Sequence, residues 1–235
     1  MAINHYFTLD GIRSDSFNVG ISSSTLYSSS ERDITTEHLV GRNGDHLTDE
    51  GAFLNRSVVF DCWIAHTFKT DFNRFRNWLM AHTDNYYKLR DNQHPDYYFM
   101  ARVVGPIEPQ PLVRRRAGTF LVQFDVKPQW FRTDGEAYQS VSSSITNPTS
   151  FKCKPKLLIT GKGTVTISGQ TITVLSTCPT NQVYVDCETM DAYNGSTNLN
   201  NYVSLPLKAI ELNEGSNAVS LSGCSLQIKP DWYDM

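Results

Sequence analysis

The sequence has no long apolar run and no cysteine pair with metal-binding spacing. None of its windows approaches the roughly 18 consecutive apolar residues that a membrane span requires, and the first residues lack the basic and apolar regions of a secretory signal. We therefore expect no membrane association. The five cysteines are odd in number and include no Cys-x-x-Cys pair, which predicts reduced, mostly buried thiols in a protein made in a cytoplasm.

An excess of one charge is also missing. The 235 residues include 21 Lys and Arg against 24 Asp and Glu, and charged residues make up only 19% of the chain. With a net charge of −3, the protein has no basic field to attract nucleic acid, so direct nucleic-acid binding is not expected. The apolar content of 40% is that of a globular protein, and the low charge suggests surfaces that another molecule covers.

Motifs of enzymes are absent as well. The six histidines stand in unrelated contexts, without a Gly-x-Ser-x-Gly sequence or a His-x-His or His-x-x-x-His pair. No glycine-rich phosphate loop is present. Asp186 and Glu188 share one face of a predicted strand, but the polar side of an amphipathic strand explains both. We predict no catalytic residue, no metal ligand and no cofactor, and hence no enzyme.

The composition changes near the middle of the chain. Residues 1–135 hold 12 Arg and 3 Lys, whereas residues 136–235 hold 6 Lys and no Arg. The stretch from Gly135 to Ser150 is rich in Ser, Thr, Asn and Pro and has no apolar periodicity. We therefore predict two domains, residues 1–135 and 151–235, with 136–150 as a linker or as the first edge strand of the second domain.

A sheet covered by one short helix is predicted for the first domain. Apolar and polar residues alternate from Thr119 to Val126, and Val58 to Ile64 and Tyr97 to Val104 are short runs rich in β-branched and aromatic residues. A helix is expected over about 70–82, with Thr70 as its N-cap. Its apolar stripe is formed by Phe72, Phe75, Trp78 and Leu79.

The second domain is predicted to be entirely β. Two alternating segments, Val165 to Ile167 and Ile172 to Val174, flank the turn residues 168–171 and predict a hairpin. A second hairpin is expected around Ser222-Gly223. Strands at this spacing, without a helical pattern, indicate a sandwich of about 85 residues.

Two groups of residues are candidates for binding. Exposed aromatic rings are the groups on which sugars stack, and the second half offers Tyr184, Tyr193, Tyr202 and Trp232. Each of these serves equally well in a core or at a subunit contact. The densest charge cluster is Arg114, Arg115 and Arg116. It is expected to begin a strand after a proline-rich loop and to form a solvated or partner-facing patch rather than a phosphate contact.

Several short segments follow one another in a characteristic order. In the first half they are Phe7-Thr-Leu-Asp-Gly-Ile, Phe17-Asn-Val-Gly-Ile, Leu39-Val-Gly-Arg-Asn-Gly-Asp-His-Leu47, Asp71 to Leu79, Tyr86-Tyr-Lys-Leu, Tyr97-Tyr-Phe-Met-Ala-Arg-Val and Phe120 to Pro128. In the second half they are Pro155-Lys-Leu-Leu-Ile-Thr-Gly, Val185-Asp-Cys-Glu, Leu212 to Val219 and Lys229-Pro-Asp-Trp. In this order the segments resemble the distal tail protein (Dit) family of long, non-contractile-tailed bacteriophages that infect Gram-positive hosts.

The resemblance implies a mainly β protein. It implies an N-terminal β-sandwich or split-barrel-like domain with one short helix, followed by a galectin-like β-sandwich over 151–235. It further implies a structural virion protein, a hub adaptor of the distal tail and baseplate, in which six copies form one ring or a pair of rings. The partners implied are the major tail tube protein, a tail-tip or tail-associated lysin protein and, in many phages, a receptor-binding protein. Such a protein is assembled in the host bacterial cytoplasm and resides at the virion tail tip.

The interface residues are predicted from turn and aromatic composition. We expect ring contacts at Gly41, Arg42 and Gly44 in the loop 41–51, at Tyr86 and Tyr87, and at the three consecutive arginines. The alternative function is a monomeric carbohydrate-binding protein whose galectin-like half recognises a host cell-wall polysaccharide. A sugar binder would change its aromatic fluorescence with that polysaccharide and without assembly, whereas an adaptor would bind tail proteins.

Overall fold

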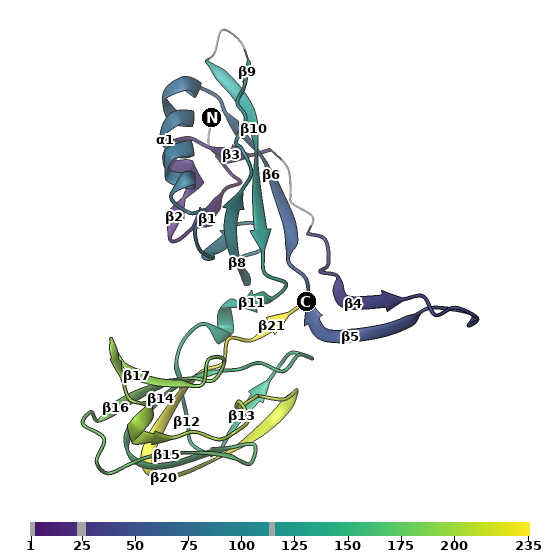
Figure 1. Ribbon diagram of the computed structural model, residues 1–235. Helices are drawn as coiled ribbons and strands as arrows, with labels where there is room; N and C mark the ends of the chain where they lie inside the picture. Colours follow the sequence, from purple (N-terminus) through teal and green to yellow (C-terminus); the bar gives the residue numbers. More distant parts are fainter. Residues whose placement is uncertain (1–2, 23–26, 113–115) are drawn as a thin grey trace. The chain divides into compact units, whose positions relative to one another are not determined.

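The computed structural model describes residues 3–22, 27–112 and 116–235 and divides the chain into two compact units (Figure 1). The first unit ends at Trp130, and the second runs from Phe131 to Asp234. The described residues contain one α-helix and many antiparallel strands, so the predicted mainly β fold class is confirmed. Residues 136–150 hold two short strands, β12 (Gln139–Val141) and β13 (Ser144–Asn147), which belong to the sheet of the second unit.

The first unit is built on one antiparallel sheet with the order β2-β1-β7-β8-β10-β6-β3. Its strands are β1 (Phe7–Leu9), β2 (Ile12–Arg13), β3 (Gly20–Ile21), β6 (Arg56–Ile64), β7 (Tyr87–Asp91), β8 (Tyr97–Val104) and β10 (Ala117–Val126), and β9 (Gln110–Leu112) pairs with the start of β10. The predicted alternation of β10 is confirmed, because Phe120, Val122, Phe124 and Val126 are all buried. A two-stranded ribbon of β4 (Arg32–Glu37) and β5 (His46–Phe53) forms a separate sheet.

The helix α1 (Phe68–Met80) buries its apolar stripe against this sheet (Figure 1). It begins two residues before Thr70, so the predicted N-cap was wrong. Thr67 occupies the N-cap position, and its hydroxyl donates a hydrogen bond to the Asp71 carboxylate. The earlier start has a tertiary cause, because the Phe68 ring packs against Phe120 of β10, with ring centres 6.4 Å apart, and adds one more buried ring to the stripe.

Aromatic rings fill the space between the helix and the sheet. Phe7 lies at the centre, stacked on Phe60 at 5.2 Å between ring centres and edge-on to Phe124 at 5.5 Å. Phe75 of α1 meets the same group from the helix side, 6.1 Å from Phe7. The short 3-10 helix η1 (Ser14–Phe17) lies against α1, where Phe17 stacks on Trp78. Burial of this many rings makes the first unit a rigid platform for its surface elements.

The second unit is a β-sandwich-type fold whose two longest strands, β14 and β20, pair with each other along most of their length. Its sheet order is β12-β20-β14-β16-β17-β18, with β13 on β20 and β15 between β14 and β19. The remaining strands are β14 (Lys156–Ile167), β15 (Gln170–Val174), β16 (Gln182–Asp186), β17 (Asp191–Asn194), β18 (Thr197–Asn198), β19 (Val203–Ser204) and β20 (Gly215–Lys229). Short 3-10 helices η3 (Thr133–Gly135) and η4 (Asn200–Tyr202) occur in connections, and β11 (Trp130–Arg132) pairs with β21 (Tyr233–Asp234).

Glycines allow β14 and β20 to bend together. The predicted hairpin at Ser222-Gly223 was wrong, because these residues lie inside the continuous strand β20. The register between the strands shifts between Gly161 and Thr164, and a Cβ at Gly163 would lie 2.0 Å from the Ser222 carbonyl oxygen. The glycine-containing segment that predicts a turn therefore forms a β-bulge in the β14–β20 pair. The other predicted hairpin is confirmed, since Ser168 and Gly169 form a two-residue turn between β14 and β15, both with positive φ.

All five cysteines are free thiols, as the sequence predicts. Burial raises the pKa of Cys153 and of Cys187 to about 12, and it also raises the pKa of Cys62. These thiols are protonated at neutral pH and are not nucleophiles.

Candidate interaction surfaces

The β4–β5 ribbon extends away from the main sheet of the first unit (Figure 1). Nearly every one of its residues is exposed. Its turn contains Gly41 and Gly44, both with positive φ, so the segment predicted to form a turn does so. The rest of the predicted loop 41–51 is different, because residues from His46 onward form β5 and pair with β4. The β-branched residues Ile34, Thr35 and Thr36 explain β4, and cross-strand pairing with them extends β5.

Apolar side chains on the ribbon are open to solvent. Val40 is 98% exposed and Leu47 is 62% exposed, and Ile34 and Leu39 are exposed as well. Arg32 forms two hydrogen bonds with Asp49 across the ribbon, at 2.9 and 2.7 Å, and they lower the pKa of Asp49. Exposed ion pairs add little stability, and an isolated two-stranded ribbon is marginal in water. The ribbon is therefore suited to bind another protein surface.

A hydrogen-bond network fixes the root of the ribbon, where β5 leads into β6. The Asn55 side-chain amide donates to the Tyr86 hydroxyl and, at 3.1 Å, to the Asp125 carboxylate. The Tyr86 hydroxyl donates to Asp125 at 3.1 Å, and Arg102 Nε does so at 2.9 Å. The Lys127 ammonium lies 5.1 Å from the centre of the Tyr86 ring. Tyr86, a predicted contact residue, thus holds the ribbon's last strand to the main sheet.

Arg56 ties the two ends of the ribbon together. Its Nη1 donates to the Ser28 carbonyl oxygen at 2.9 Å, and its guanidinium lies 4.6 Å from the centre of the Trp130 ring. The side chain is 5% exposed, and this burial lowers its pKa to about 10. Arg56 therefore remains charged at neutral pH, held by ring faces and a backbone carbonyl at the point where the ribbon leaves the sheet.

The other predicted contact residues lie elsewhere on the first unit. The Tyr87 ring packs 4.6 Å from His82, and its hydroxyl donates to Asp84. Arg116 lies in the turn between β9 and β10, where its carbonyl oxygen accepts a hydrogen bond from Phe68, and it does not begin a strand. Arg114 and Arg115 lie outside the described residues. The structure therefore places Tyr86 at the ribbon's root and Arg42 in its turn, with Tyr87 and Arg116 at two further places.

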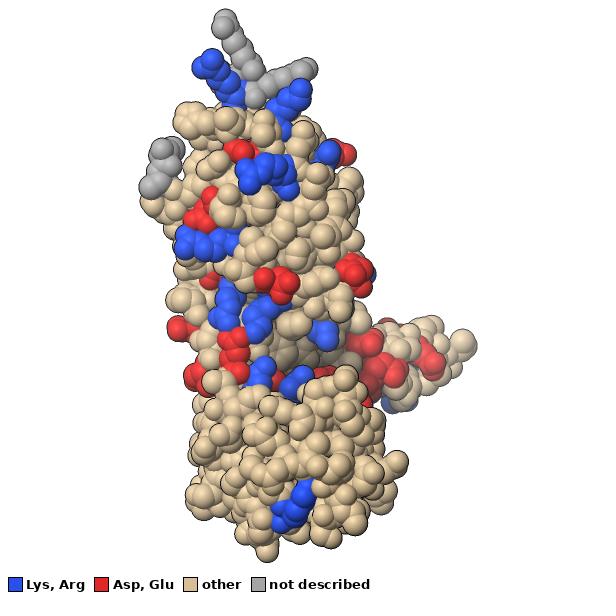
Figure 2. Space-filling view, turned by 90° about the vertical axis from the view of Figure 1, so that its left-hand side faces the viewer, with Lys and Arg blue, Asp and Glu red and all other residues tan. Residues whose placement is uncertain are grey.

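The second unit carries little charge on the face that Figure 2 presents. Of the aromatic residues predicted as sugar platforms, Trp232 is only 4% exposed and Tyr202 packs against the core. Tyr184 and Tyr193 are half-buried on the outward face of the sheet, where their rings stack with centres 5.8 Å apart. Tyr184 and Tyr193 are the two candidates whose rings stack on each other on this outward face.

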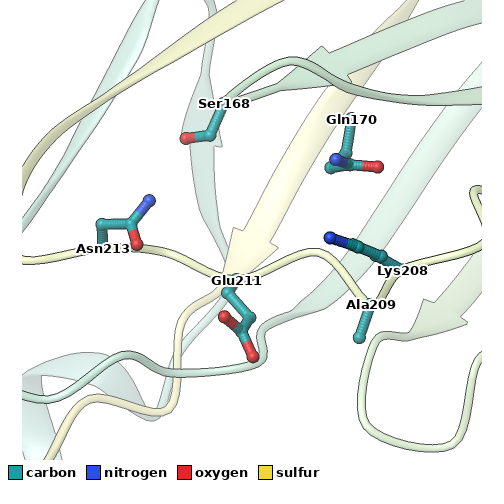
Figure 3. A pocket seen from close by; sticks show the side chains of 6 residues that line it. All are labelled: Ser168, Gln170, Lys208, Ala209, Glu211 and Asn213. Carbon is teal, nitrogen blue, oxygen red and sulfur yellow. The ribbon is translucent and has the colours of Figure 1, made fainter.

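A polar pocket of about 360 Å³ is also present on the second unit (Figure 3). Its lining residues are Ser168, Gln170, Lys208, Ala209, Glu211 and Asn213. Figure 3 shows Ser168 and Asn213 on one side of the pocket and Gln170 and Lys208 on the other. The pocket offers hydrogen-bond donors and acceptors but no aromatic surface.

Asp186 makes the stability of the second unit sensitive to acid. Burial by itself raises the pKa of this carboxyl, but hydrogen bonds from Lys156, at 2.9 Å, and from backbone N–H groups outweigh it and hold the pKa below 3.8. The pKa of Asp186 is lower in the folded state than in the unfolded state, so its ionised carboxylate stabilises the fold. That contribution is fully present above pH 3.8 and is lost as the pH falls through the folded pKa. We expect Asp186→Asn to flatten the acid side of the stability profile. Urea unfolding at a series of pH values measures this, and an unchanged profile would contradict it.

Neither a metal centre nor a membrane helix is found where the structure describes the chain. No group of three or more His, Cys, Asp or Glu side chains within residues 3–22, 27–112 and 116–235 is placed to hold a metal ion. The helix among those residues is too short and too polar to cross a membrane.

Known structures share this fold over almost the whole chain. The SPP1 Dit (gp 19.1) protein, described as a paradigm of the hub adsorption apparatus in Gram-positive infecting phages, is 13% identical with a TM-score of 0.69, over 95% of this chain and 97% of that one. Chains of the phage P2 baseplate in its activated conformation, with Ca and with Sr, give TM-scores of 0.55 and 0.54 at 9% identity. They cover 98% and 97% of this chain and 100% and 98% of theirs.

No protein-family model matches the sequence, and neither does any curated protein. The agreement with the solved structures lies in the fold. At that level the predicted resemblance is confirmed, since this chain has the fold of the SPP1 Dit protein in both units.

Proposed function

We propose that this chain is a distal tail protein, a structural hub of the phage tail tip that forms a ring of six copies. The observation that carries the proposal is the fold shared with the SPP1 Dit protein over nearly the full length of both chains. At 13% identity, such agreement in two successive units supports a common role better than a similarity confined to one sandwich.

The first unit forms the ring in this proposal. A closed ring uses the same heterologous contact between each pair of neighbours, so each subunit needs a projecting surface and a receiving one. The β4–β5 ribbon is the projecting surface, with its exposed apolar residues and unpaired strand edges. Gly41, Arg42 and Gly44 would make contacts at its turn. Tyr86 would set its direction, and Tyr87 and the arginines 114–116 would contribute elsewhere in the interface.

The second unit projects outward as a galectin-like sandwich. The ring joins the major tail tube protein to a tail-tip or tail-associated lysin protein, and it offers an attachment point for receptor-binding proteins. The protein is assembled in the cytoplasm of the host bacterium and resides in the virion tail tip. In this proposal it acts without catalysis and without a cofactor.

Native mass spectrometry across a concentration series tests the ring. Six chains of 26.6 kDa give a particle of about 160 kDa, or twice that mass for two rings, and negative-stain images should show a central hole. Where ring closure needs a neighbour, the major tail tube protein or the tail-tip protein from the same phage should capture the monomer. A chain that stays monomeric and binds neither partner would contradict the proposal.

A further inference from the structure

A row of side chains crosses the outward face of the second unit's sheet. The cross-strand register aligns Tyr193 of β17 with Tyr184 of β16, Tyr184 with Leu158 of β14, and Leu158 with Gln227 of β20. Asn198 of β18 stands opposite Tyr193 and extends the row on its other side. Residues opposite one another in a sheet point to the same face, so these side chains form one continuous surface.

The centre of this surface is apolar and its margins are polar. The stacked rings of Tyr184 and Tyr193 continue into Leu158, and the Tyr138 ring lies edge-on to Tyr184 with centres 6.1 Å apart. Gln227 is exposed. The hydroxyl groups of both stacked tyrosines and the Gln227 amide make no hydrogen bond within the described part of the chain. The margins therefore offer donors and acceptors that only water or a ligand satisfies.

The charged residues beside the row nearly cancel, and one exposed carboxylate, Asp191 of β17, is left over opposite Asp186. Lys156 and Asp186 are the neighbours of the row on β14 and β16, and they neutralise each other at 2.9 Å. Lys229, opposite Lys156 on β20, is paired with Asp231 at 3.3 Å. A phosphate or another anionic group would therefore gain no attraction here, because both lysines are already paired and an exposed carboxylate is present. A neutral ligand with an apolar face and a rim of hydroxyl groups fits both the rings and the amides.

We infer that this face is a binding site for a neutral carbohydrate, with a pyranose ring stacked on Tyr184 and Tyr193 and its hydroxyl groups bonded by Gln227 and Asn198. The C–H groups on one side of a pyranose are apolar and match the ring faces, whereas the hydroxyl rim matches the amides. This site is independent of the ring proposed for the first unit, and it gives the hub a direct contact with a glycan surface.

An array of immobilised bacterial surface glycans, probed with the full-length protein, tests this site. We expect binding to one or more neutral glycans. The double substitution Tyr184→Ala and Tyr193→Ala should weaken the apparent affinity about 10-fold or more, because stacking on both rings is lost. The matched pair Tyr184→Phe and Tyr193→Phe keeps the rings and should stay within about 3-fold of the unmodified protein.

Two further variants distinguish binding at this site from binding at the polar pocket and from a loss of folding. Gln170→Ala alters the polar pocket of Figure 3 and should leave binding unchanged. Gln227→Arg adds a long side chain at an exposed position and should block the row without removing a ring from the sheet. This variant keeps the test valid even where the alanine pair fails to fold. No binding to any neutral glycan, binding unaffected by Gln227→Arg, or binding lost in Gln170→Ala would each overturn the inference. A face that binds a tail protein and no glycan is a protein-docking surface instead.

Discussion

Removal of the β4–β5 ribbon should leave a folded chain that forms no ring. The register pairs Arg32 with Phe53, so residues 33–52 are replaceable by a two-residue Asn-Gly turn that joins the two strand ends. Nearly every deleted residue is exposed, and the Arg56–Ser28 and Leu54–Glu31 hydrogen bonds at the root remain. Native mass should therefore fall to that of the monomer at all concentrations, whereas the melting temperature should change by no more than about 2 °C.

Point substitutions separate the ribbon's contacts from its length. Ile34→Asp and Leu47→Asp place charges on its exposed apolar residues and should also abolish the ring. Leu207→Asp is the matched control, because Leu207 is fully exposed and belongs to the second unit, which contributes no residue to the proposed interface. A ring that persists without the ribbon would remove the ribbon from the interface. A ring lost equally in the Leu207 variant would indicate a general effect of added charge.

Short-range patterns predict the strands and the helix of the first unit because burial there follows local periodicity. Phe120, Val122, Phe124 and Val126 alternate in the sequence and are all buried in β10. The start of α1 was predicted two residues late, because a long-range contact, the packing of Phe68 on the sheet residue Phe120, decides it. Local patterns therefore give an element's type better than its end.

The ribbon and the tyrosine row show what local patterns miss. Leu47 lies in β5, a strand that is exposed on both faces. The sequence of β5 therefore lacks the alternation of apolar and polar residues by which a half-buried strand is predicted. Tyr184 and Tyr193 are evident as aromatic residues, but their stacking depends on the register of β16 against β17. Gln227 lies on β20, much later in the chain, and it shares their face only because β14 pairs with β16 on one side and with β20 on the other. No spacing in the sequence encodes that neighbourhood.

The bulge between β14 and β20 also depends on a contact between residues far apart in the sequence, and a substitution there has the second large expected effect. Gly163→Ala should destabilise the second unit severely, because the added Cβ would lie 2.0 Å from the Ser222 carbonyl oxygen, a backbone atom that moves only if β20 moves. Both strands supply core residues of the sandwich, including Leu157 and Ile228. A loss of about 3 kcal/mol is expected, which is the upper end of the usual range for overpacking in a core.

Hydrogen–deuterium exchange measures this loss unit by unit. Amides of β14 and β20 should exchange more than about 100-fold faster in Gly163→Ala, whereas those of β6 and β10 in the first unit serve as the internal reference. Gly169→Ala is the matched control, since Gly169 has a φ of +84° but open space around its Cβ position. It should cost only about 1 kcal/mol of backbone strain. If the amides of the two variants exchange at the same rates, β14 and β20 do not approach each other as closely at Gly163 and Ser222 as described. The turn predicted at Ser222-Gly223 would then need an explanation other than a bulge.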